Sequence, residues 1–400
     1  MRAVSSESLR FVARSAAALL LLPGLLATSV APSVAQSTGE VAIKSKQAIV
    51  MDADSGAVLF QRNADDLVPP ASMSKLMLLV ILFNALRAGL IQLTTEVPMS
   101  EHAWRTGGAP SRSSSMFVPL GKTATVDELL KGIVVQSGND AAISIAEKLG
   151  GSENAFADRM TAEARRLGLS KSVFRNATGL HDPEHLMTVR EIALLARHII
   201  AEYPDFYPLF AMREFNYRHH KFHNRNPLLG WIAGVDGLKT GFISQSGYGI
   251  VASAKQDSRR LIIAINGAAT AEERKDDSRR LFEWGFRNFS EGRLFDAGEI
   301  VGHARVWGGE RMYMPLTGKG EVTIVLPRSP ANPRLSGRIY YQGPLKPPLK
   351  KGEQVAVLRV TSLNDATSEV PLYAAEDVNE AGFIRRGLDS LLYLATRWLP

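Results

Sequence analysis

The stretch PPASMSKLMLLVILFNALRAG, residues 69–89, decides the fold of the first half of the chain. The proline pair favours a break before a helix, and Gly89 is typical of the residue that follows one. Between them, the side chains from Leu76 to Phe83 are apolar on every side of a helix. A helix that is apolar all round is normally buried. The stretch therefore predicts a buried helix over residues 72–87.

A serine and a lysine occupy the first turn of this predicted helix. Ser72 and Lys75 are three residues apart, so they share one helix face and the amine can reach the hydroxyl. The unpaired N–H groups of a helix N-terminus also favour an alkoxide or an oxyanion. The same residues are consistent with a plain N-cap at Ser72 and a solvated Lys75. By itself the pair is a weak indication of a nucleophilic serine.

Two further short motifs carry polar groups that suit the same chemistry. Ser137-Gly138-Asn139 lies between two predicted helices, with Asp140 placed to cap the second. Lys239-Thr240-Gly241 ends a predicted strand and is the only Lys-Thr-Gly in the chain. Each has an ordinary structural interpretation: a short polar loop for the first, and a lysine that protects an edge strand from aggregation for the second.

Strand and helix patterns follow one another between residues 47 and 289. Residues 47–62 alternate as a hairpin with a tight turn at Asp54-Ser55-Gly56. Two capping boxes are expected, Thr125-x-x-Glu128 and Thr188-x-x-Glu191. The predicted helices cover residues 126–135, 141–149, 153–167, 189–202 and 272–289, and the predicted strands cover 235–241, 248–256 and 260–267. This order predicts an α+β domain over residues 40–292.

After Arg293 the pattern changes to short strands and proline-rich turns. The strand patterns are Glu321–Leu326, Arg338–Tyr341 and Gln354–Val360, which predict a small all-β domain over residues 293–379. From Phe383 to Leu399, apolar residues then recur at helical spacing, with arginines on the opposite face. Residues 380–400 are therefore expected to form an amphipathic helix that lies on a membrane surface. Docking of this helix on its own protein is the alternative.

Residues 1–35 have the pattern of a secretory signal peptide. Arg2, Arg10 and Arg14 precede an apolar stretch, and Ser33-Val34-Ala35 places small residues where a signal peptidase acts. The apolar run is shorter than the roughly 20 residues that a membrane span needs. We therefore expect cleavage after Ala35 and export of the mature protein.

The composition is that of a folded soluble protein, with 45% hydrophobic and 22% charged residues. The absence of cysteine excludes disulfides, thiolate metal sites and a cysteine nucleophile. The net charge of +7 suits anionic partners but is spread along the chain. No nucleic-acid motif accompanies it, so no nucleic-acid partner is expected.

The remaining basic side chains offer no better candidate site. Three histidines have the spacing of metal ligands: His219, His220 and His223. Their basic neighbours would repel a cation, so we expect a polar loop there. His181 and His185 are also expected in loops, since neither has an obvious acidic partner. The arginine pairs at 259–260 and 279–280 are expected to form solvated faces or membrane-facing charge. We expect neither a metal ion nor a cofactor.

The three motifs in this order resemble those of the penicillin-recognising serine enzymes. Within that superfamily the chain is similar to the low-molecular-mass D-alanyl-D-alanine carboxypeptidases, from Ala48 to the C-terminus. The similar segments are AIVMDADSG at 48–56, PASMSK at 70–75, NATGL at 176–180, DGLKTG at 236–241 and GY at 247–248. The resemblance implies a β-lactamase/transpeptidase-like domain, in which helices flank an antiparallel sheet, followed by a β-rich domain and a terminal amphipathic helix.

The resemblance also implies a role for each motif residue. Ser72 would be the nucleophile, Ser137 would relay a proton to the leaving D-alanine nitrogen, and Asn139 would hold Lys75 and the substrate amide. Lys239 and Thr240 would bind the terminal carboxylate of the substrate. The remaining implied positions are Gly241, at the substrate, and the backbone N–H groups of Ser72 and Phe242, which would form the oxyanion hole. Phe242 departs from the histidine that many relatives carry, which leaves the substrate preference open.

The residue types themselves place one requirement on this chemistry. A serine hydroxyl is a poor nucleophile until a base takes its proton. Lys75 can be that base only when neutral, so its pKa must be lowered by burial or by a nearby cation, for which Lys239 is a candidate. Which group is the acylation base stays open at this point.

The expected function is removal of the terminal D-alanine from the pentapeptide of peptidoglycan through an acyl-Ser72 intermediate, with inhibition by β-lactams. One alternative is a β-lactamase, but residues 171–180 contain no acidic residue for deacylation. The other is a non-catalytic peptidoglycan-binding scaffold, which would have no need of Ser72 or Lys75. The expected location is the periplasmic face of the inner membrane, with the C-terminal helix on the membrane surface.

Overall fold

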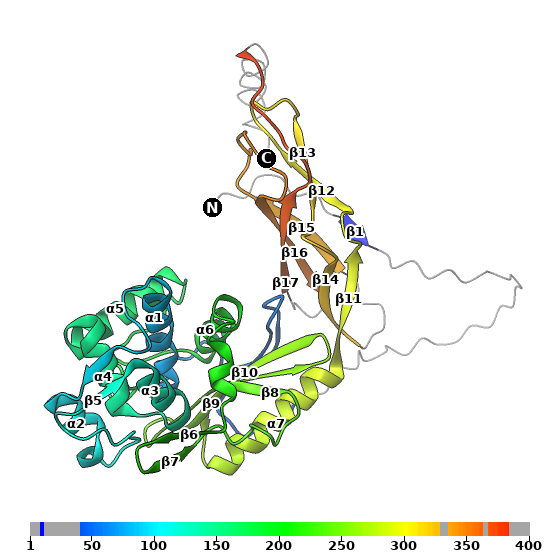
Figure 1. Cartoon of the computed structure of the whole chain (residues 1–400). Helices are drawn as coiled ribbons and strands as arrows, with labels where there is room; N and C mark the ends of the chain where they lie inside the picture. The colour runs from blue at the N-terminus through cyan, green and yellow to red at the C-terminus, as the bar shows by residue number, and fades with distance from the viewer. Residues whose placement is uncertain (1–8, 12–40, 329–334, 363–366, 384–400) are drawn as a thin grey trace, which may run out of the picture. The chain divides into compact units, whose positions relative to one another are not determined.

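The computed structural model describes residues 9–11, 41–328, 335–362 and 367–383 of the chain. These residues form two compact units, one from Val41 to Phe286 and the other from the described residues on either side of it (Figure 1). The predicted signal peptide lies almost entirely outside the described residues, and the predicted C-terminal helix lies outside them beyond Phe383.

An antiparallel sheet of five strands forms the centre of the first unit, in the order β3-β2-β10-β9-β8. The predicted hairpin is confirmed as β2 (Gln47–Asp52) and β3 (Val58–Arg62), and the three later strands are β8 (Val235–Ile243), β9 (Gly247–Gln256) and β10 (Arg259–Ala268). Strand β8 is the edge strand, so its outer side is available to other groups.

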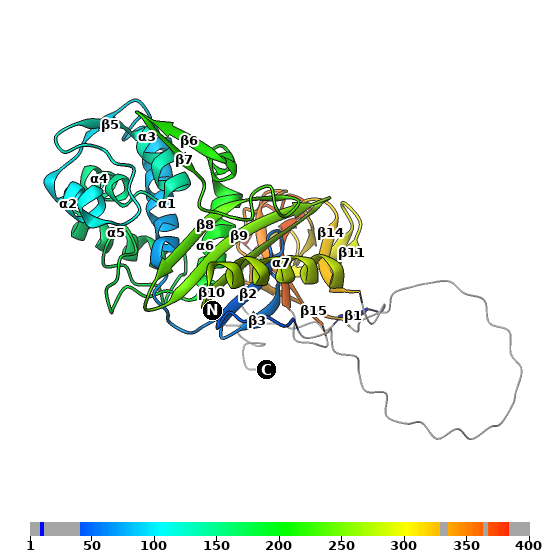
Figure 2. The same cartoon turned by 90° about the horizontal axis from the view of Figure 1, so that it is seen from below.

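Both faces of this sheet are buried, each by different helices. Along β10, Ile262 and Ala264 pack into the cluster that contains helix α1, whereas Ile263 and Ile265 pack against Leu281 and Phe282 of α7. This alternation follows from the two-residue side-chain period of a strand. Helix α1 (Lys75–Arg87) lies on one face and α7 (Ala271–Asn288) on the other (Figure 2). The predicted burial of residues 76–83 is confirmed, since all eight side chains are buried.

The other elements of this unit complete the helical part around α1. The helices are α2 (Glu101–Gly107), α3 (Val126–Lys131), α4 (Asn139–Gly150), α5 (Glu153–Arg166) and α6 (Val189–Glu202). The 3-10 turns are Ala71–Ser74, Ala109–Ser111 and Tyr207–Ala211, and a π-helical turn covers Gly132–Gln136. Two small hairpins pair β4 (Glu96–Pro98) with β5 (Thr123–Thr125) and β6 (Glu214–Tyr217) with β7 (His220–His223).

Helix starts agree only partly with the sequence prediction. The Thr125–Glu128 capping box is confirmed. At the second site, Thr188 caps α6, but the Glu191 carboxylate accepts hydrogen bonds from Lys171 N and Ser172 Oγ, so the reciprocal half of the predicted box is wrong. Asp140 is not a cap either, because α4 begins at Asn139 and Asp140 lies inside its first turn. Its carboxylate accepts hydrogen bonds from the loop at residues 115–118.

The second unit confirms the predicted all-β domain and has more strands than the sequence indicated. The predicted strands correspond to β14 (Val322–Pro327), β15 (Leu335–Tyr341) and β16 (Gln354–Ser362). The strands not predicted are β11 (Phe289–Phe295), β12 (Ile300–Arg305), β13 (Tyr313–Thr317) and β17 (Thr367–Ala374). Pro315 lies within β13 and Pro371 within β17, and proline is a signal against strand.

One sheet of this unit has the order β1-β15-β16-β17-β13-β12, where β1 is Leu9–Phe11, and β11 pairs separately with β14. The division between the two units falls after Phe286. The boundary between residues 292 and 293 stays a prediction. Within the described residues, no helix has the length and apolar character needed to cross a membrane.

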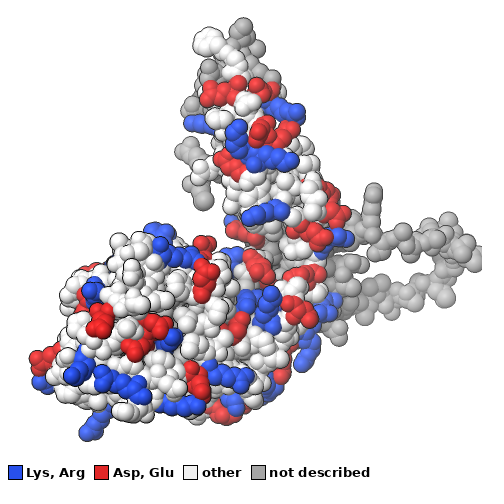
Figure 3. Space-filling model, viewed as in Figure 1, with Lys and Arg blue, Asp and Glu red and all other residues white. Residues whose placement is uncertain are grey.

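Charged side chains of both signs are interspersed over the face of the molecule in Figure 3. The prediction that the arginine pair 259–260 is solvated is wrong. Arg259 is buried, and the Arg260 guanidinium donates to both carboxylate oxygens of Asp236 at 2.7 Å. Asp236 in turn accepts from the Tyr207 hydroxyl at 2.6 Å. This network therefore ties the start of β8 to the rest of the unit.

Candidate active site

The backbone places Ser72 and Lys75 at the start of α1 with their side chains in contact. Ser72 lies in the 3-10 turn Ala71–Ser74, and Lys75 is the first residue of the helix. The Lys75 ammonium nitrogen is 2.9 Å from Ser72 Oγ, and the Lys75 side chain is fully buried. A solvated Lys75 is therefore excluded, and the predicted approach of amine to hydroxyl is confirmed.

The second motif reaches the same lysine from a different part of the chain. Asn139 Oδ1 accepts a hydrogen bond from Lys75 Nζ at 2.7 Å, and Asn139 Nδ2 donates to Ser113 Oγ at 2.8 Å. Ser137 follows the π-helical turn in a left-handed conformation, with φ of 63°. Its hydroxyl oxygen is buried without a hydrogen-bond partner. A buried hydroxyl without a partner is unusual and marks a place where a ligand or water can bind.

A third contact to Lys75 was not assigned from the sequence. The backbone carbonyl of Thr178 accepts a hydrogen bond from Lys75 Nζ at 2.6 Å. In the sequence, the segment Asn176–Leu180 carries a family resemblance but no assigned role. A main-chain carbonyl carries no side-chain signal, so only the packing of this turn against the start of α1 could reveal the contact.

Lys239 lies on the edge strand β8 and is buried, with 2% of its surface exposed. A buried lysine cannot protect an edge strand from aggregation, so the ordinary structural interpretation of this motif is wrong. Its ammonium group donates a hydrogen bond to the Thr240 carbonyl at 3.2 Å. Gly241 lies close to the Ser72 turn, since a Cβ added to it would be 2.8 Å from the Pro70 carbonyl oxygen. Strand β8 can approach the serine this closely because position 241 is a glycine.

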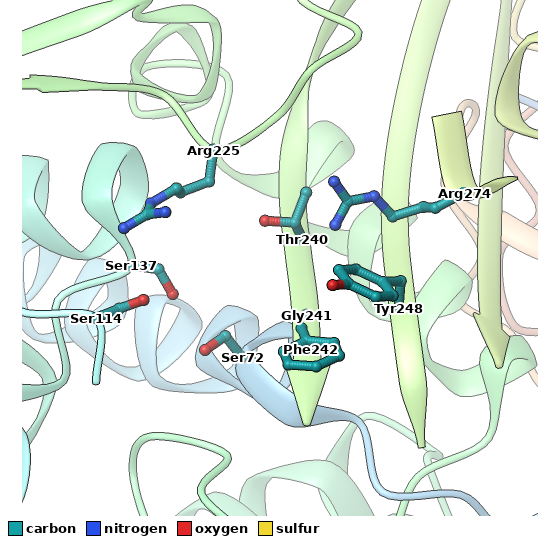
Figure 4. A pocket seen from close by; sticks show the side chains of 9 residues that line it. All are labelled: Ser72, Ser114, Ser137, Arg225, Thr240, Gly241, Phe242, Tyr248 and Arg274. Carbon is teal, nitrogen blue, oxygen red and sulfur yellow. The ribbon is translucent and has the colours of Figure 1, made fainter. Parts of the chain in front are cut away.

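A pocket of about 320 Å³ is lined by predicted residues of all three motifs, namely Ser72, Ser137, Thr240, Gly241 and Phe242, whereas the buried Lys75, Asn139 and Lys239 are not among its lining residues. Figure 4 shows Ser114 and Ser137 on one wall and Thr240, Gly241 and Phe242 on the other, with Ser72 between them at the base. The structure thus brings together the residues predicted from all three motifs. The further lining residues are Arg225, Tyr248 and Arg274.

Neither arginine was predicted as a site residue. Arg274 comes from α7 and extends over the Tyr248 ring toward Thr240, with its guanidinium carbon 5.6 Å from the ring centroid (Figure 4). Its Nε is buried without a partner. Arg225 is one of the basic neighbours of the histidine triplet at 219–223, and its Nε donates to Gln136 Oε1 at 3.2 Å. Both residues lie outside the three motifs, so no local pattern identifies them as site residues.

Phe242 presents its ring at the rim of the pocket, with 53% of its surface exposed. It pairs with Tyr248 directly across the β8–β9 ladder, and the two ring centroids are 4.2 Å apart. Phe242 therefore forms an aromatic wall of the pocket, at the position where many relatives are expected to carry histidine.

The electrostatics of the pocket follow from burial and from the crowding of cations. Burial holds the pKa of Lys75 well below its usual value, and the positive charge of Lys239 lowers it further. The predicted influence of Lys239 is thus confirmed as the second cause. Burial also lowers the pKa of Lys239 to about 7, with Arg225 and Arg274 contributing in the same direction. The site combines a lysine that can be neutral with several cations that can attract an anion.

The predicted polar loop is wrong for two of the three clustered histidines, because His220 and His223 belong to the strand β7 of a hairpin. The predicted loop position of His185 is confirmed, although its side chain is buried beside Phe174 and its Nδ1 accepts a hydrogen bond from Arg175 N at 3.3 Å. Burial lowers the pKa of His185 to about 4. In the described part of the chain, no cluster of three His, Asp or Glu side chains is arranged to hold a metal ion.

Comparison with known protein families gives two matches that together span most of the chain. Residues 33–270 match the family described as D-alanyl-D-alanine carboxypeptidase. Residues 289–380 match the family described as penicillin-binding protein 5, C-terminal domain.

Curated relatives match over nearly their full length. The D-alanyl-D-alanine carboxypeptidase DacC of Escherichia coli (strain K12) is 35% identical, with 94% of this chain and 97% of that protein covered. The D-alanyl-D-alanine carboxypeptidase DacF of Bacillus subtilis (strain 168) is 31% identical, with 91% of this chain and 95% of that protein covered.

Solved structures agree with these matches. Penicillin-binding protein 5 from Haemophilus influenzae has a TM-score of 0.73 at 32% identity, covering 86% of this chain and 99% of that one. Penicillin-binding protein D2 from Listeria monocytogenes, in its ampicillin-bound form, has a TM-score of 0.57 at 28% identity, covering 62% of this chain and 100% of that one.

Proposed function

Because the chain belongs to the D-alanyl-D-alanine carboxypeptidase family of serine peptidases, we propose that its pocket removes the terminal D-alanine from peptidoglycan stem peptides through an acyl-Ser72 intermediate. The observation that carries this proposal is the contact between Ser72 Oγ and the fully buried Lys75 Nζ, at 2.9 Å. It supplies both a nucleophile and a base whose pKa burial lowers.

In the acylation step, neutral Lys75 takes the proton of Ser72 Oγ as that oxygen attacks the carbonyl carbon of the penultimate D-alanine. The resulting oxyanion accepts hydrogen bonds from the backbone N–H groups of Ser72 and Phe242. Each such donor contributes about 3–4 kcal/mol in related acyl transfers. The oxyanion then collapses, the C–N bond breaks, and the leaving nitrogen receives a proton through the Ser137 hydroxyl. Water later attacks the ester and restores Ser72.

The cations of the pocket bind the carboxylate at the end of the substrate. Lys239 and Thr240 have this role in the motif, and Arg274 reaches the same strand from α7 (Figure 4). A guanidinium can bind a carboxylate through two parallel hydrogen bonds. Arg225 adds positive charge on the Ser137 side of the pocket. Asn139 holds Lys75 through its Oδ1, and the motif assigns it the substrate amide as well.

The same pocket accepts β-lactams, whose ring carbonyl and carboxylate mimic the scissile bond and the terminal carboxylate. Slow hydrolysis of the adduct is expected. The turn that faces Lys75 offers it the Thr178 carbonyl, and residues 171–180 include no carboxylate that could activate a deacylating water.

The test is intact-mass analysis of the full-length protein after incubation with penicillin, together with an assay of D-alanine release from a pentapeptide. One adduct, mapped to Ser72, and release of one D-alanine per peptide are expected. An adduct on another residue, or rapid loss of the adduct with turnover of penicillin, would contradict the proposal.

We further propose that the protein is exported by residues 1–35 and that residues 384–400 hold it on the periplasmic face of the inner membrane. The support is the sequence pattern of both segments. The cut that tests this lies after Phe383, because Glu380 and Ala381 still pair with Gly309 and Gly308 of the β-rich unit. Removal of residues 384–400 should release active enzyme into the soluble periplasmic fraction.

A full-length variant with charge on the apolar face, Leu391→Glu with Leu392→Glu, should be released in the same way. If the shortened protein still pellets with membranes as wild type does, the proposed membrane anchor is wrong.

A further inference from the structure

The turn that holds Lys75 is itself held by hydrogen bonds to two side chains. Asn176 Oδ1 accepts from Thr178 N at 3.1 Å, from Thr178 Oγ1 at 2.9 Å and from Gly179 N at 2.7 Å. The N–H of Ala177, in the same turn, donates to Glu153 Oε1 at 3.0 Å, and that of Leu180 donates to Thr178 Oγ1 at 3.1 Å. The Thr178 carbonyl that binds Lys75 is therefore fixed on one side by Asn176 and on the other by Glu153.

Glu153 is a buried carboxylate for which the proposed mechanism has no chemical step. It is the first residue of α5, and 9% of its side chain is exposed. Its second oxygen, Oε2, lies 2.8 Å from Nε2 of His102, a half-exposed residue of α2. The same helix α2 ends at Gly107, where an added Cβ would be 2.4 Å from Asp140 N at the start of α4. Glu153 thus connects the turn at residues 176–180 to the helix that supports the second motif.

We propose that Glu153 is a positioning residue for acylation, and that its carboxylate anchors Ala177 so that the Thr178 carbonyl stays aligned on the Lys75 ammonium nitrogen. This inference rests on the proposed function of Ser72 and Lys75. Glu153 touches neither the substrate nor the reacting atoms, and it acts through the turn.

The charge of Glu153 gives this role a measurable signature. The ionisable groups around Lys75 are Lys239 from β8, Asp140 from α4, Glu153 from α5 and His185 from the turn-bearing loop. Burial and Lys239 lower the pKa of Lys75, whereas the negative charges of Glu153 and Asp140 raise it. Loss of the Glu153 charge therefore lowers the pKa of Lys75 further, and Lys75 then becomes neutral at lower pH.

Two substitutions separate the anchor from the charge. Glu153→Gln keeps an oxygen that can accept from Ala177 N but removes the charge. The acidic limb of its pH profile, over which the rate of acylation by penicillin rises, should therefore lie at a lower pH than in wild type. Glu153→Ala removes anchor and charge, and it should slow acylation by about ten- to a hundredfold at the optimum pH, because misplacement of about 1 Å has effects of this order.

Glu191 provides a matched control, because it too is a buried carboxylate near a helix start that accepts from a neighbouring loop. It is buried in the first turn of α6, its Oε1 accepts from Lys171 N at 2.8 Å, and its Oε2 accepts from Ser172 Oγ at 2.5 Å. It is absent from the charges that act on Lys75. Glu191→Gln should reduce the melting temperature without moving the acidic limb.

A folded Glu153→Ala that acylates at the wild-type rate would overturn the proposal, and so would an acidic limb that moves equally in Glu191→Gln. Where Glu153→Ala fails to fold, Glu153→Gln still tests the anchor: it keeps an acceptor for Ala177 N and should acylate at close to the wild-type rate at the optimum pH, so a tenfold or larger loss there would overturn the proposal. Absence of acylation in wild type would instead contradict the function proposed for Ser72, so the two failures are distinguishable.

Discussion

Gly179 lies directly against Ala71: a Cβ added at position 179 would be 2.0 Å from the Ala71 carbonyl oxygen. Gly179 also has a φ of 79°, a conformation that only glycine adopts without strain. The turn that binds Lys75 and the turn that carries Ser72 are thus in backbone contact. Substitution at this glycine should therefore affect the catalytic pair directly.

Gly179→Ala should abolish or slow acylation by penicillin at least tenfold and destabilise the protein by more than the roughly 1–2 kcal/mol of a left-handed alanine. Gly168→Ala is the matched control, because Gly168 has the same φ of 79° but nothing within 4 Å of an added Cβ. It should show the conformational penalty alone and acylate normally. Equal acylation by the two variants would mean that the contact with Ala71 has no role in the site.

Ser72→Ala should remove both penicillin labelling and D-alanine release while the melting temperature stays close to that of wild type. The hydroxyl is the only group that the substitution deletes, and the bond to be formed is to that oxygen. Lys75→Ala should be nearly as damaging, since groups that act as a unit are not additive. D-alanine release by Ser72→Ala near the wild-type rate would exclude Ser72 as the nucleophile.

The carboxylate-binding role of Lys239 predicts a basic limb in the pH profile. The pKa of Lys239 is lowered to about 7, so the free enzyme carries this cation below pH 7 and loses it above. For a substrate with a free terminal carboxylate, kcat/KM should fall as the pH rises through about 7. An amidated peptide should show no such fall, because it has no carboxylate to bind.

Lys239→Arg is the companion variant, because a guanidinium stays charged throughout this range. Its kcat/KM should be lower than that of wild type but free of the basic limb near pH 7. A basic limb that persists unchanged in Lys239→Arg, or that is equal for free-acid and amidated peptides, would assign the titration to another group.

Arg274→Ala should raise KM for the free-acid peptide by about ten- to a hundredfold, the range that corresponds to loss of one charged hydrogen-bonding group. The expected effect on kcat is smaller, because Arg274 lies beyond Thr240 and away from Ser72 (Figure 4). Arg279→Ala on the same helix is the control, since Arg279 is paired with Glu283 outside the pocket. An equal change in KM for both variants would show a general effect of charge.

Local sequence patterns were sufficient to predict most of the helices and strands and to identify the three motifs. The all-apolar run from Leu76 to Phe83 predicted a buried helix, because a helix that is apolar on every side is stable only when all its sides are shielded from water. The serine and lysine spacing predicted that Ser72 and Lys75 meet, since residues three apart share a helix face. Strands that contain Pro315 and Pro371 were missed, because the pairing of the whole sheet outweighed the local signal against strand.

The sequence by itself thus determined the chemical groups of the site and the local geometry of the Ser72–Lys75 pair. Only the tertiary structure decided what surrounds them: the Thr178 carbonyl on Lys75, Arg274 over Tyr248, and Glu153 behind the turn. The physical reason is that periodicity reports which face of an element is buried, not which distant element covers it. The lowered pKa of Lys75 has the same origin, because burial and the approach of Lys239 exist only once the helices and the edge strand have packed together.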